Sequence, residues 1–311
     1  MTNAGILHQM WAVPGISDRQ CILDAAEDVR LAEELGFESF WFGEHHFNRD
    51  KMFFGRVPVP ELLMARLAAS TRHIRLGTGI KVLPLDTAAR FAEKMALLDL
   101  LTDRRANFGI GEGTRGPLVS EETKGLRYRE ELAELIAFLR GDVSDGRPAL
   151  TPAPERDLTR LLWAAVRNFE SIRASAAHGI NLALGQLGNS AFQRQFVDVY
   201  REAGGSGEVR AFRLALVAGT DAEGAALKRQ AAEVYPSMRD GVATDPSSDT
   251  FIVCGSPQTA AEQILQFKTE CDADRVDLLA HIPGLSHEVV QQTLSLYARE
   301  VAPLVGVTML S

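Results

Sequence analysis

The chain has 311 residues, of which 46% are hydrophobic and 24% charged, a composition typical of globular proteins that excludes disordered and fibrous classes. Its 33 Lys and Arg against 41 Asp and Glu give a formal net charge of −8, which argues against a nucleic-acid partner and favours a small molecule. No run reaches the ~20 apolar residues that cross a bilayer, and the three cysteines are widely spaced. We therefore expect a cytoplasmic protein without a membrane partner, a disulfide framework or a zinc knuckle.

Strand-like and helix-like patterns alternate along the chain, which is typical of βα units around a parallel sheet. The first strand is predicted at residues 5–10, and a helix follows it from the capping box at residues 17–20 to Gly36. Next come a strand at 39–42, a helix at 61–70, a strand at 74–80, a helix at 87–101 and a strand at 107–110.

The second half continues the alternation. The predicted elements are strands at 161–165, 180–184, 209–218 and 276–281, with helices at 169–178, 222–235, 257–271 and 286–301. Eight strands in βα order predict an α/β fold, the (β/α)8 TIM barrel. The irregular stretches at 112–125, 141–160 and 236–250 are too short to form a further domain, so we expect residues 1–311 to be a single barrel domain.

Polar side chains follow most of the predicted strands at their carboxyl ends. In a barrel of this kind these ends meet at one mouth, where functional groups gather. The residues concerned are His8 and Gln9, Glu44, His45 and His46, Glu112, Arg167 and Asn168, and His281. This set of side chains suggests an enzyme.

Glu44, His45 and His46 come directly after an aromatic strand. Neighbouring histidines at a strand end point in different directions, and the helical His-Glu-x-x-His spacing that gives zinc two ligands is absent, so we expect no metal. One of the two histidines is expected to be packed and hydrogen-bonded as a structural residue. Because an imidazole titrates near neutrality, the other is a candidate general acid or base.

Residues 111–116 (GEGTRG) match the dinucleotide fingerprint G-x-G-x-x-G. That fingerprint normally ends the first strand of a doubly wound sheet and opens a helix, whereas here three strands precede it. Residues 117–123 show no helical periodicity either. The context therefore disfavours a Rossmann dehydrogenase.

Several stretches of the chain together resemble the bacterial luciferase-like flavin-dependent monooxygenases. In the first half these are FGEHHF (42–47), RLGTGIKVLPL (75–85) and the run from RFAE (90–93) through LLDLL (97–101) to NFGIG (107–111). In the second half they are LWAA (162–165) with AAHG (176–179), and VCGSP (253–257) with AEQI (261–264). The resemblance thus covers nearly the whole chain.

The resemblance implies the same (β/α)8 barrel, usually as a homodimer formed through the early helices. It implies an oxidoreductase that takes reduced FMN from a separate NAD(P)H:flavin reductase and uses O2 to oxygenate a small organic substrate through a flavin C4a-hydroperoxide. Two alternatives stay open. One is a hydride-transfer enzyme that uses the deazaflavin F420, and the other is a noncatalytic flavin-binding barrel or partner subunit.

The resemblance also assigns roles to residues around the flavin ring. His45, with Glu44 beside it, takes the place of the histidine that assists flavin oxygenation in the family. A cis peptide bond that supports the ring aligns with Gly79 and Ile80, directly after Thr78. A glycine at this point would relieve crowding near the ring.

Phosphate binding is where the sequence departs from the family pattern. Members commonly have an arginine where this chain has Glu112, an anion in place of a cation. The resemblance places a second arginine at Arg127, and the turn after the fifth strand offers Ala165, Arg167, Asn168 and Ser171. We expect Arg127 and Arg167 to replace the missing cation, since a guanidinium pairs bidentately with phosphate.

The substrate pocket is expected near the barrel mouth, at Met10, Trp11 and Phe47 together with Met52, Phe53 and Phe54. These side chains suggest a partly aromatic, apolar pocket. An aromatic or polyketide-like substrate fits it best, with a long-chain aldehyde as the second choice.

Overall fold

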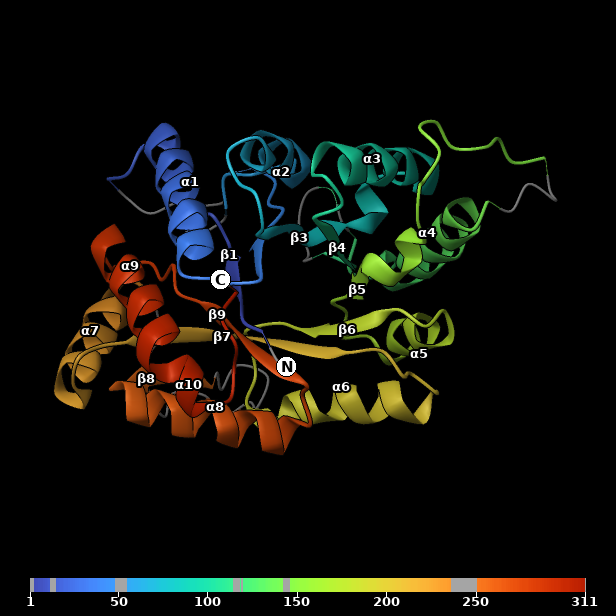
Figure 1. Cartoon of the computed structure of the whole chain (residues 1–311). Coiled ribbons are helices and arrows are strands. Elements are labelled where there is room, and N and C mark those ends of the chain that lie inside the picture. The colour runs from blue at the N-terminus through green and yellow to red at the C-terminus, as the bar shows by residue number, and fades with distance from the viewer. Residues whose placement is uncertain are drawn as a thin grey trace.

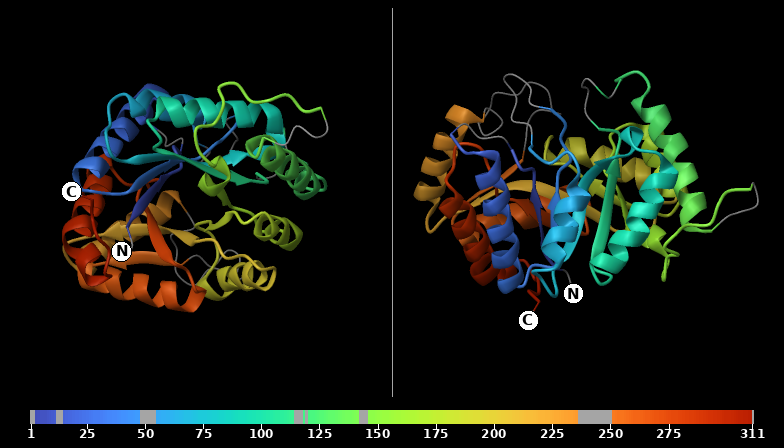
Figure 2. Two further views of the ribbon diagram at one scale, coloured as in Figure 1. Left: turned by 45° about the vertical axis from the view of Figure 1, so that its right-hand side comes forward. Right: turned by 90° about the horizontal axis from the view of Figure 1, so that it is seen from above.

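A computed structural model describes residues 3–11, 15–47, 55–113, 118, 120–141, 146–235 and 251–310. Eight parallel strands form a closed ring in these residues, with helices packed around its outside (Figures 1 and 2). In ring order they are β1 (Gly5–His8), β2 (Ser39–Phe42), β3 (Arg75–Val82), β4 (Ala106–Gly111), β5 (Leu162–Ala164), β6 (Asn181–Leu184), β7 (Val209–Val217) and β9 (Arg275–Leu279), which pairs back with β1. The predicted (β/α)8 barrel is confirmed.

The helices follow the strands along the chain and begin at side-chain caps. The hydroxyl oxygen of Ser17 accepts a hydrogen bond from the backbone N–H of Gln20, as the predicted capping box requires. The helices are α1 (Asp18–Glu34), α2 (Pro60–Ala68), α3 (Ala88–Leu101), α4 (Lys124–Leu139), α5 (Phe169–Ala177), α6 (Ser190–Glu202), α7 (Asp221–Val234), α8 (Pro257–Cys271), α9 (His287–Leu296) and the short α10 (Ala302–Leu304).

The strand β8 (Ile252–Gly255) and the helices α4 and α6 are not among the elements predicted from the sequence. β8 pairs with the second half of β7, in register from Leu214 opposite Ile252. β7 has nine residues and pairs with β6 only through its first three, so β8 covers the edge that remains. The helix α6 fills the connection between β6 and β7. In addition, β1 ends at His8 rather than at Met10, whose φ of 53° lies in the left-handed region and interrupts the strand.

The barrel interior holds a buried ion pair. The guanidinium of Arg210 lies between the rings of Trp41 and Trp163, with its central carbon 4.6 and 4.4 Å from their centroids. Its Nη1 is 3.1 Å from Oδ2 of Asp277, whose other oxygen accepts a hydrogen bond from the backbone N–H of Gly5. Arg210 and Asp277 are both almost completely buried. The pair therefore ties β7 to β9 and β1 inside the ring.

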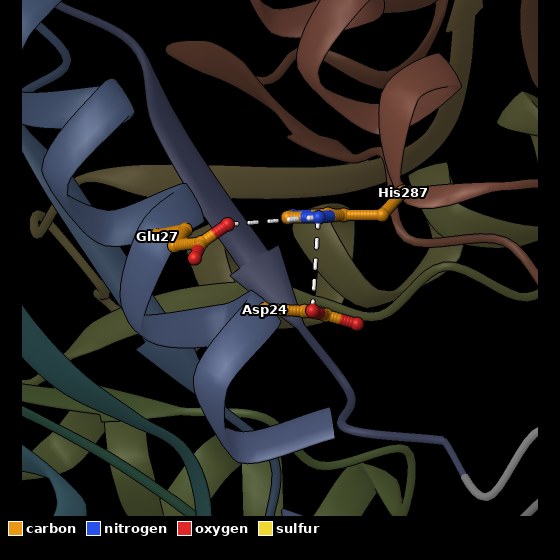
Figure 3. Close-up of side chains that lie close together, drawn as sticks. All are labelled: Asp24, Glu27 and His287. Carbon is orange, nitrogen blue, oxygen red and sulfur yellow. Dashed lines mark ion pairs between the residues drawn. The ribbon is translucent and has the colours of Figure 1, made fainter. Parts of the chain in front are cut away.

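On the outside, a histidine joins the first long helix to the last. His287, the first residue of α9, has its Nε2 2.7 Å from Oδ1 of Asp28 on α1. Its Nδ1 lies 3.7 Å from Asp24 and 4.0 Å from Glu27, and Figure 3 shows both carboxylates directed at the ring. The hydrogen bond to Asp28, together with the charges of these carboxylates, raises the pKa of His287.

This cluster predicts a pH-dependent contribution to stability. Because the folded-state pKa of His287 is raised above its unfolded value of about 6.5, the stabilisation is fully present below that value and is lost as the pH rises through the folded pKa. His287→Gln should therefore lower the free energy of unfolding by about 1 kcal/mol near pH 6 and by less near pH 9. Denaturant titrations at both pH values would measure it. The exposed His73 supplies the control, and equal losses at both pH values would contradict the prediction.

Candidate active site

A cavity of about 300 Å³ opens at the carboxyl ends of strands β1 to β6, at the lower end of the volumes of ligand pockets. Its wall combines charged and apolar side chains. The described residues that line it include Gln9, Trp11, Glu44, His45, His46, Gly79, Ile80, Val82, Leu85, Glu112, Lys124, Ala165, Arg167, Ala183, Leu184, Leu187 and Phe196. Of the polar residues predicted after the strands, Gln9, Glu44, His45, His46, Glu112 and Arg167 therefore meet at this mouth. His8 and His281 do not line this cavity and instead stack on each other, with ring centroids 4.2 Å apart.

His45 is half-buried in this wall and its ring is closely held. Its Nε2 lies 2.7 Å from Oε1 of Gln9, and its backbone N–H donates to the carbonyl of Val57. The ring packs so tightly against Gly55 that a Cβ there would come within 2.4 Å of its Cδ2. A Cβ on Gly43 would similarly come within 2.3 Å of Oε1 of Gln9. The neighbouring backbone therefore fixes both the ring and its partner.

Glu44 is buried and links the ends of β2 and β3. Its Oε1 lies 2.8 Å from Nε2 of His46, and its Oε2 lies 3.0 Å from Nζ of Lys81. Burial raises the pKa of Glu44, and Lys81 opposes that effect. Burial alone would lower the pKa of Lys81, but the carboxylates of Glu44 and Glu61 raise it instead. Glu44 therefore orients His46 and anchors β3.

The peptide bond between Gly79 and Ile80 is cis, at the position that the resemblance implies, and both residues line the cavity. A Cβ on Gly79 would lie 2.6 Å from Cδ1 of Leu7 and 2.9 Å from Cβ of Trp41. The glycine is thus needed for packing against the barrel interior, and the expectation that it also relieves crowding near a bound ring stays a prediction. Thr78 is fully buried, and its hydroxyl donates to the carbonyl of Gly109 instead of reaching the cavity.

Positive charge without a carboxylate partner gathers on one side of the cavity. Arg167 lines the wall, and no residue in the described part of the chain forms an ion pair with it. Partial burial lowers its pKa although its side chain is open to the cavity solvent. Behind it lies the buried guanidinium of Arg213. Among the described residues it donates to the carbonyls of Phe212, Gly185 and Gly188, and burial lowers its pKa to about 9. This side of the cavity favours an anion.

Glu112 also lines the cavity, where the resemblance leads us to expect an arginine. It is only 5% exposed, and its Oε1 has no hydrogen-bond partner among the described residues. The hydroxyl of the nearby Tyr128 lies 3.1 Å from that of Ser175. Burial raises the pKa of Tyr128, and the negative charge of Glu112 raises it further. An anion in the cavity must therefore bind on the Arg167 side, away from this carboxylate.

Three residues expected at the phosphate lie elsewhere. Arg127 is exposed on α4 and does not line the cavity, whereas Lys124, one turn earlier at the start of the helix, does. Asn168 caps α5 by accepting hydrogen bonds from the backbone N–H groups of Glu170 and Ser171. The side chain of Ser171 is buried. Of the predicted phosphate residues, Ala165 and Arg167 reach the cavity wall.

The expected substrate pocket is also only partly formed by the residues named for it. Trp11 lines the cavity, but Met10 is fully buried in the hydrophobic core. Phe47 is 63% exposed and is not among the residues that line the cavity. Met52, Phe53 and Phe54 lie outside the described residues. A second aromatic wall comes instead from Phe196 on α6, which no strand-end pattern could indicate.

Among the described residues, the one grouping whose side chains could hold a metal ion is Asp24, Glu27 and His287, the cluster between α1 and α9, and none of the three lines the cavity. Within the same residues, every helix is too short or too polar to cross a membrane.

The chain is similar to proteins of known type. A family model described as luciferase-like monooxygenase matches residues 8–272. An N-acetyl-S-alkylcysteine monooxygenase of Bacillus subtilis is 28% identical over 308 residues, which cover 94% of this chain and 88% of that protein. The oxygenase component of a flavin-dependent trigonelline monooxygenase of Acinetobacter baylyi is 28% identical over 185 residues, 55% of this chain and 50% of that protein. The oxygenating constituent of 3,6-diketocamphane monooxygenase of Pseudomonas putida, solved with FMN, has a TM-score of 0.79 at 20% identity and covers 99% of each chain.

Proposed function

The chain belongs to the luciferase-like monooxygenase family, and on that premise we propose that it is the oxygenase component of a two-component flavin-dependent monooxygenase. In this proposal it uses reduced FMN and O2 to oxygenate a small organic substrate. The observation that carries the proposal is the cavity itself. A histidine fixed by a hydrogen bond, an apolar wall and Arg167, which has no ion-pair partner among the described residues, meet there at the barrel mouth.

The cavity fits FMN in its distribution of charge and apolar surface. The backbone of Gly79 and Ile80 forms one wall on which a flat ring could rest. Arg167 would hold the phosphate together with Lys124, and the positive charge of Arg213 supports the same region. Lys124 also forms an ion pair with Glu121, whose carboxylate lies 2.6 Å away. Because Glu121 is on the surface, solvent screens this pair, and Lys124 can still bind a phosphate.

When bound, reduced FMN supplies the electrons that activate O2 for transfer of one oxygen atom to the substrate. The protein's own residues keep water out and manage a proton. Ile80, Val82, Leu85 and Leu184 contribute an apolar wall beside the reacting region. His45 can hold or deliver a proton at Nε2. The aromatic rings of Trp11 and Phe196 support an aromatic or polyketide-like substrate.

A separate flavin reductase is part of the proposal. The fingerprint-like residues 111–116 follow the fourth strand of a barrel rather than the first strand of a Rossmann sheet, so this motif does not indicate a nicotinamide site. The similarity to a protein named as an oxygenase component supports the same division of labour. We expect O2 consumption only when a reductase supplies reduced flavin.

The phosphate site gives the test of this function. Arg167→Ala and Lys124→Ala should each weaken FMN binding by about 1.5 to 3 kcal/mol, the value of a charge-assisted hydrogen bond, because each removes a cation from the phosphate. Riboflavin, which lacks the phosphate, should bind the parent and both variants equally. Calorimetry under anaerobic conditions with reduced flavins would measure the affinities.

Arg127→Ala is the matched control, since Arg127 lies on the same helix as Lys124 but is exposed. Equal affinity of the parent for FMN and riboflavin would contradict the phosphate site and favour a noncatalytic barrel in which Glu112 marks a lost contact. Hydride transfer from reduced F420, with no O2 uptake from reduced FMN, would instead favour the F420-dependent alternative.

We also propose a homodimer formed through α2 and α3. These adjacent helices expose large apolar side chains, with Leu62 71%, Leu97 47% and Leu101 55% exposed. The Leu97→Glu/Leu101→Glu double variant should sediment as a monomer while the parent sediments as a dimer. Leu265→Glu on α8, where Leu265 is 43% exposed, should leave the dimer intact. A monomeric parent would rule out this interface.

A further inference from the structure

Gln9 has no role in the function proposed above, yet it holds the histidine on which that function depends. It follows β1, is only 8% exposed and directs Oε1 at Nε2 of His45 across 2.7 Å. The absence of side chains at Gly43 and Gly55 lets this pair pack against the backbone of the neighbouring loop. The contact is therefore built by three segments of the chain, namely the ends of β1 and β2 and the residues before α2.

At Nε2, the two adjacent histidines meet groups of different charge. Nε2 of His46 lies 2.8 Å from the carboxylate of Glu44, which is in turn paired with Lys81. Nε2 of His45 instead meets the uncharged amide oxygen of Gln9. A carboxylate stabilises the imidazolium strongly, whereas an amide oxygen accepts a hydrogen bond without adding a counter-charge.

We propose that Gln9 is a positioning residue that fixes the neutral Nε2–H tautomer of His45. The amide oxygen can only accept a hydrogen bond, so the ring nitrogen that faces it must carry the proton. In this tautomer one ring nitrogen can give a proton while the other can take one, which is what a residue that delivers and recovers a proton requires. The role in catalysis rests on the proposed function, but the tautomer itself does not.

The test uses nitrogen NMR of the full chain labelled with 15N-histidine, without flavin. We expect His45, identified by its absence in His45→Ala, to show the pattern of the Nε2–H tautomer in the parent. In Gln9→Met the two tautomers should become mixed, because the acceptor is gone. In Gln9→Glu the midpoint of the His45 titration should rise by about one pH unit or more, because an opposite charge then faces the ring.

Gln291→Met is the matched control, because Nε2 of Gln291 lies 3.5 Å from Nε2 of a different histidine, His287. It should leave the His45 signals unchanged. An Nδ1–H pattern for His45 in the parent, or His45 signals that do not respond to either Gln9 variant, would overturn the proposal. Gln9→Glu keeps the size of the side chain, so it carries the test if Gln9→Met does not fold.

Turnover supplies the readout that depends on the proposed function. With reduced FMN and a substrate, Gln9→Met should lower kcat about tenfold and leave flavin affinity unchanged. The effect is smaller than the loss of the general acid itself, because the variant keeps His45 and removes only the group that positions it. A fall in flavin affinity with unchanged kcat would contradict the positioning role. A chain that shows the Nε2–H pattern but oxygenates no substrate would contradict the proposed function alone, since the NMR measurement needs no flavin.

Discussion

Arg210→Met is expected to lower the free energy of unfolding by about 3 to 5 kcal/mol, the largest effect that we predict for a single substitution. The substitution keeps an apolar stem between Trp41 and Trp163 but removes the cation that lies 3.1 Å from the buried carboxylate of Asp277, which leaves only the charge of Arg275 acting on that carboxylate. Urea titration followed by circular dichroism would measure the loss. A loss below about 1 kcal/mol would show that the ion pair adds little to the barrel.

A double variant separates the lost pair from the lost packing. Arg210→Met/Asp277→Asn removes both charges, while the asparagine oxygen can still accept the hydrogen bond from Gly5 that Asp277 accepts at 2.7 Å. We expect this variant to recover most of the lost stability, because the cost of breaking a buried pair lies mainly in the charge left behind. A double variant as unstable as Arg210→Met would point to packing instead.

The same substitution should make stability depend on pH. Burial already raises the pKa of Asp277 in the parent, and removal of Arg210 would raise it further. A carboxyl whose folded pKa lies above its unfolded value of about 3.9 destabilises the fold increasingly as the pH rises above that value. The loss in Arg210→Met should therefore be smaller at pH 4 than at pH 8.

His45→Ala is expected to lower productive oxygenation by about 10²- to 10⁴-fold, the range contributed by a positioned general acid or base. The ring lies on the cavity wall and is not needed to hold the core, so fold and flavin affinity should be retained. Product formation per reduced flavin consumed is the measurement, because an enzyme that lacks its proton donor releases hydrogen peroxide instead of oxygenated product.

The exposed His73, which lies before β3 on the outside of the barrel, gives the control substitution His73→Ala. It should leave both the product yield and the unfolding transition unchanged. Equal product yield in His45→Ala and in the parent would remove His45 from the proposed chemistry. A lower affinity for reduced FMN with normal yield would make it a binding residue.

The barrel was predictable from the sequence because each βα unit is encoded locally. Alternating patterns and caps such as Ser17 mark every strand of the ring within a few residues. β8 is different, since its four residues become a strand only because β7 extends beyond its pairing with β6. That condition depends on a partner more than 30 residues away along the chain, which no local pattern records.

The site was predictable where strand ends determine it, as for His45 and Arg167. It was not predictable where the rotation of a helix about its axis, or the burial of a side chain, determines which residues lie at the cavity. Lys124 and Arg127 lie within one turn of α4, and only the orientation of that helix shows which of them faces the cavity. In the sequence, Arg213 looks like an ordinary strand residue. Its buried charge, which has no carboxylate partner among the described residues, lies behind the Arg167 side of the cavity.

The seam between β1 and β9 has a consequence for the order of folding. The hydrogen bond from Gly5 to Asp277 joins residues 272 positions apart, and the contact between Asp28 and His287 spans 259. β2, β3 and β4, by contrast, pair with strands that are their neighbours along the chain. Because the entropy of closing a long loop must be overcome before such distant contacts stabilise anything, we expect the ring to close late. Substitutions at the seam would then mainly accelerate unfolding, and the lifetime of the native barrel would be set by the contacts that form last.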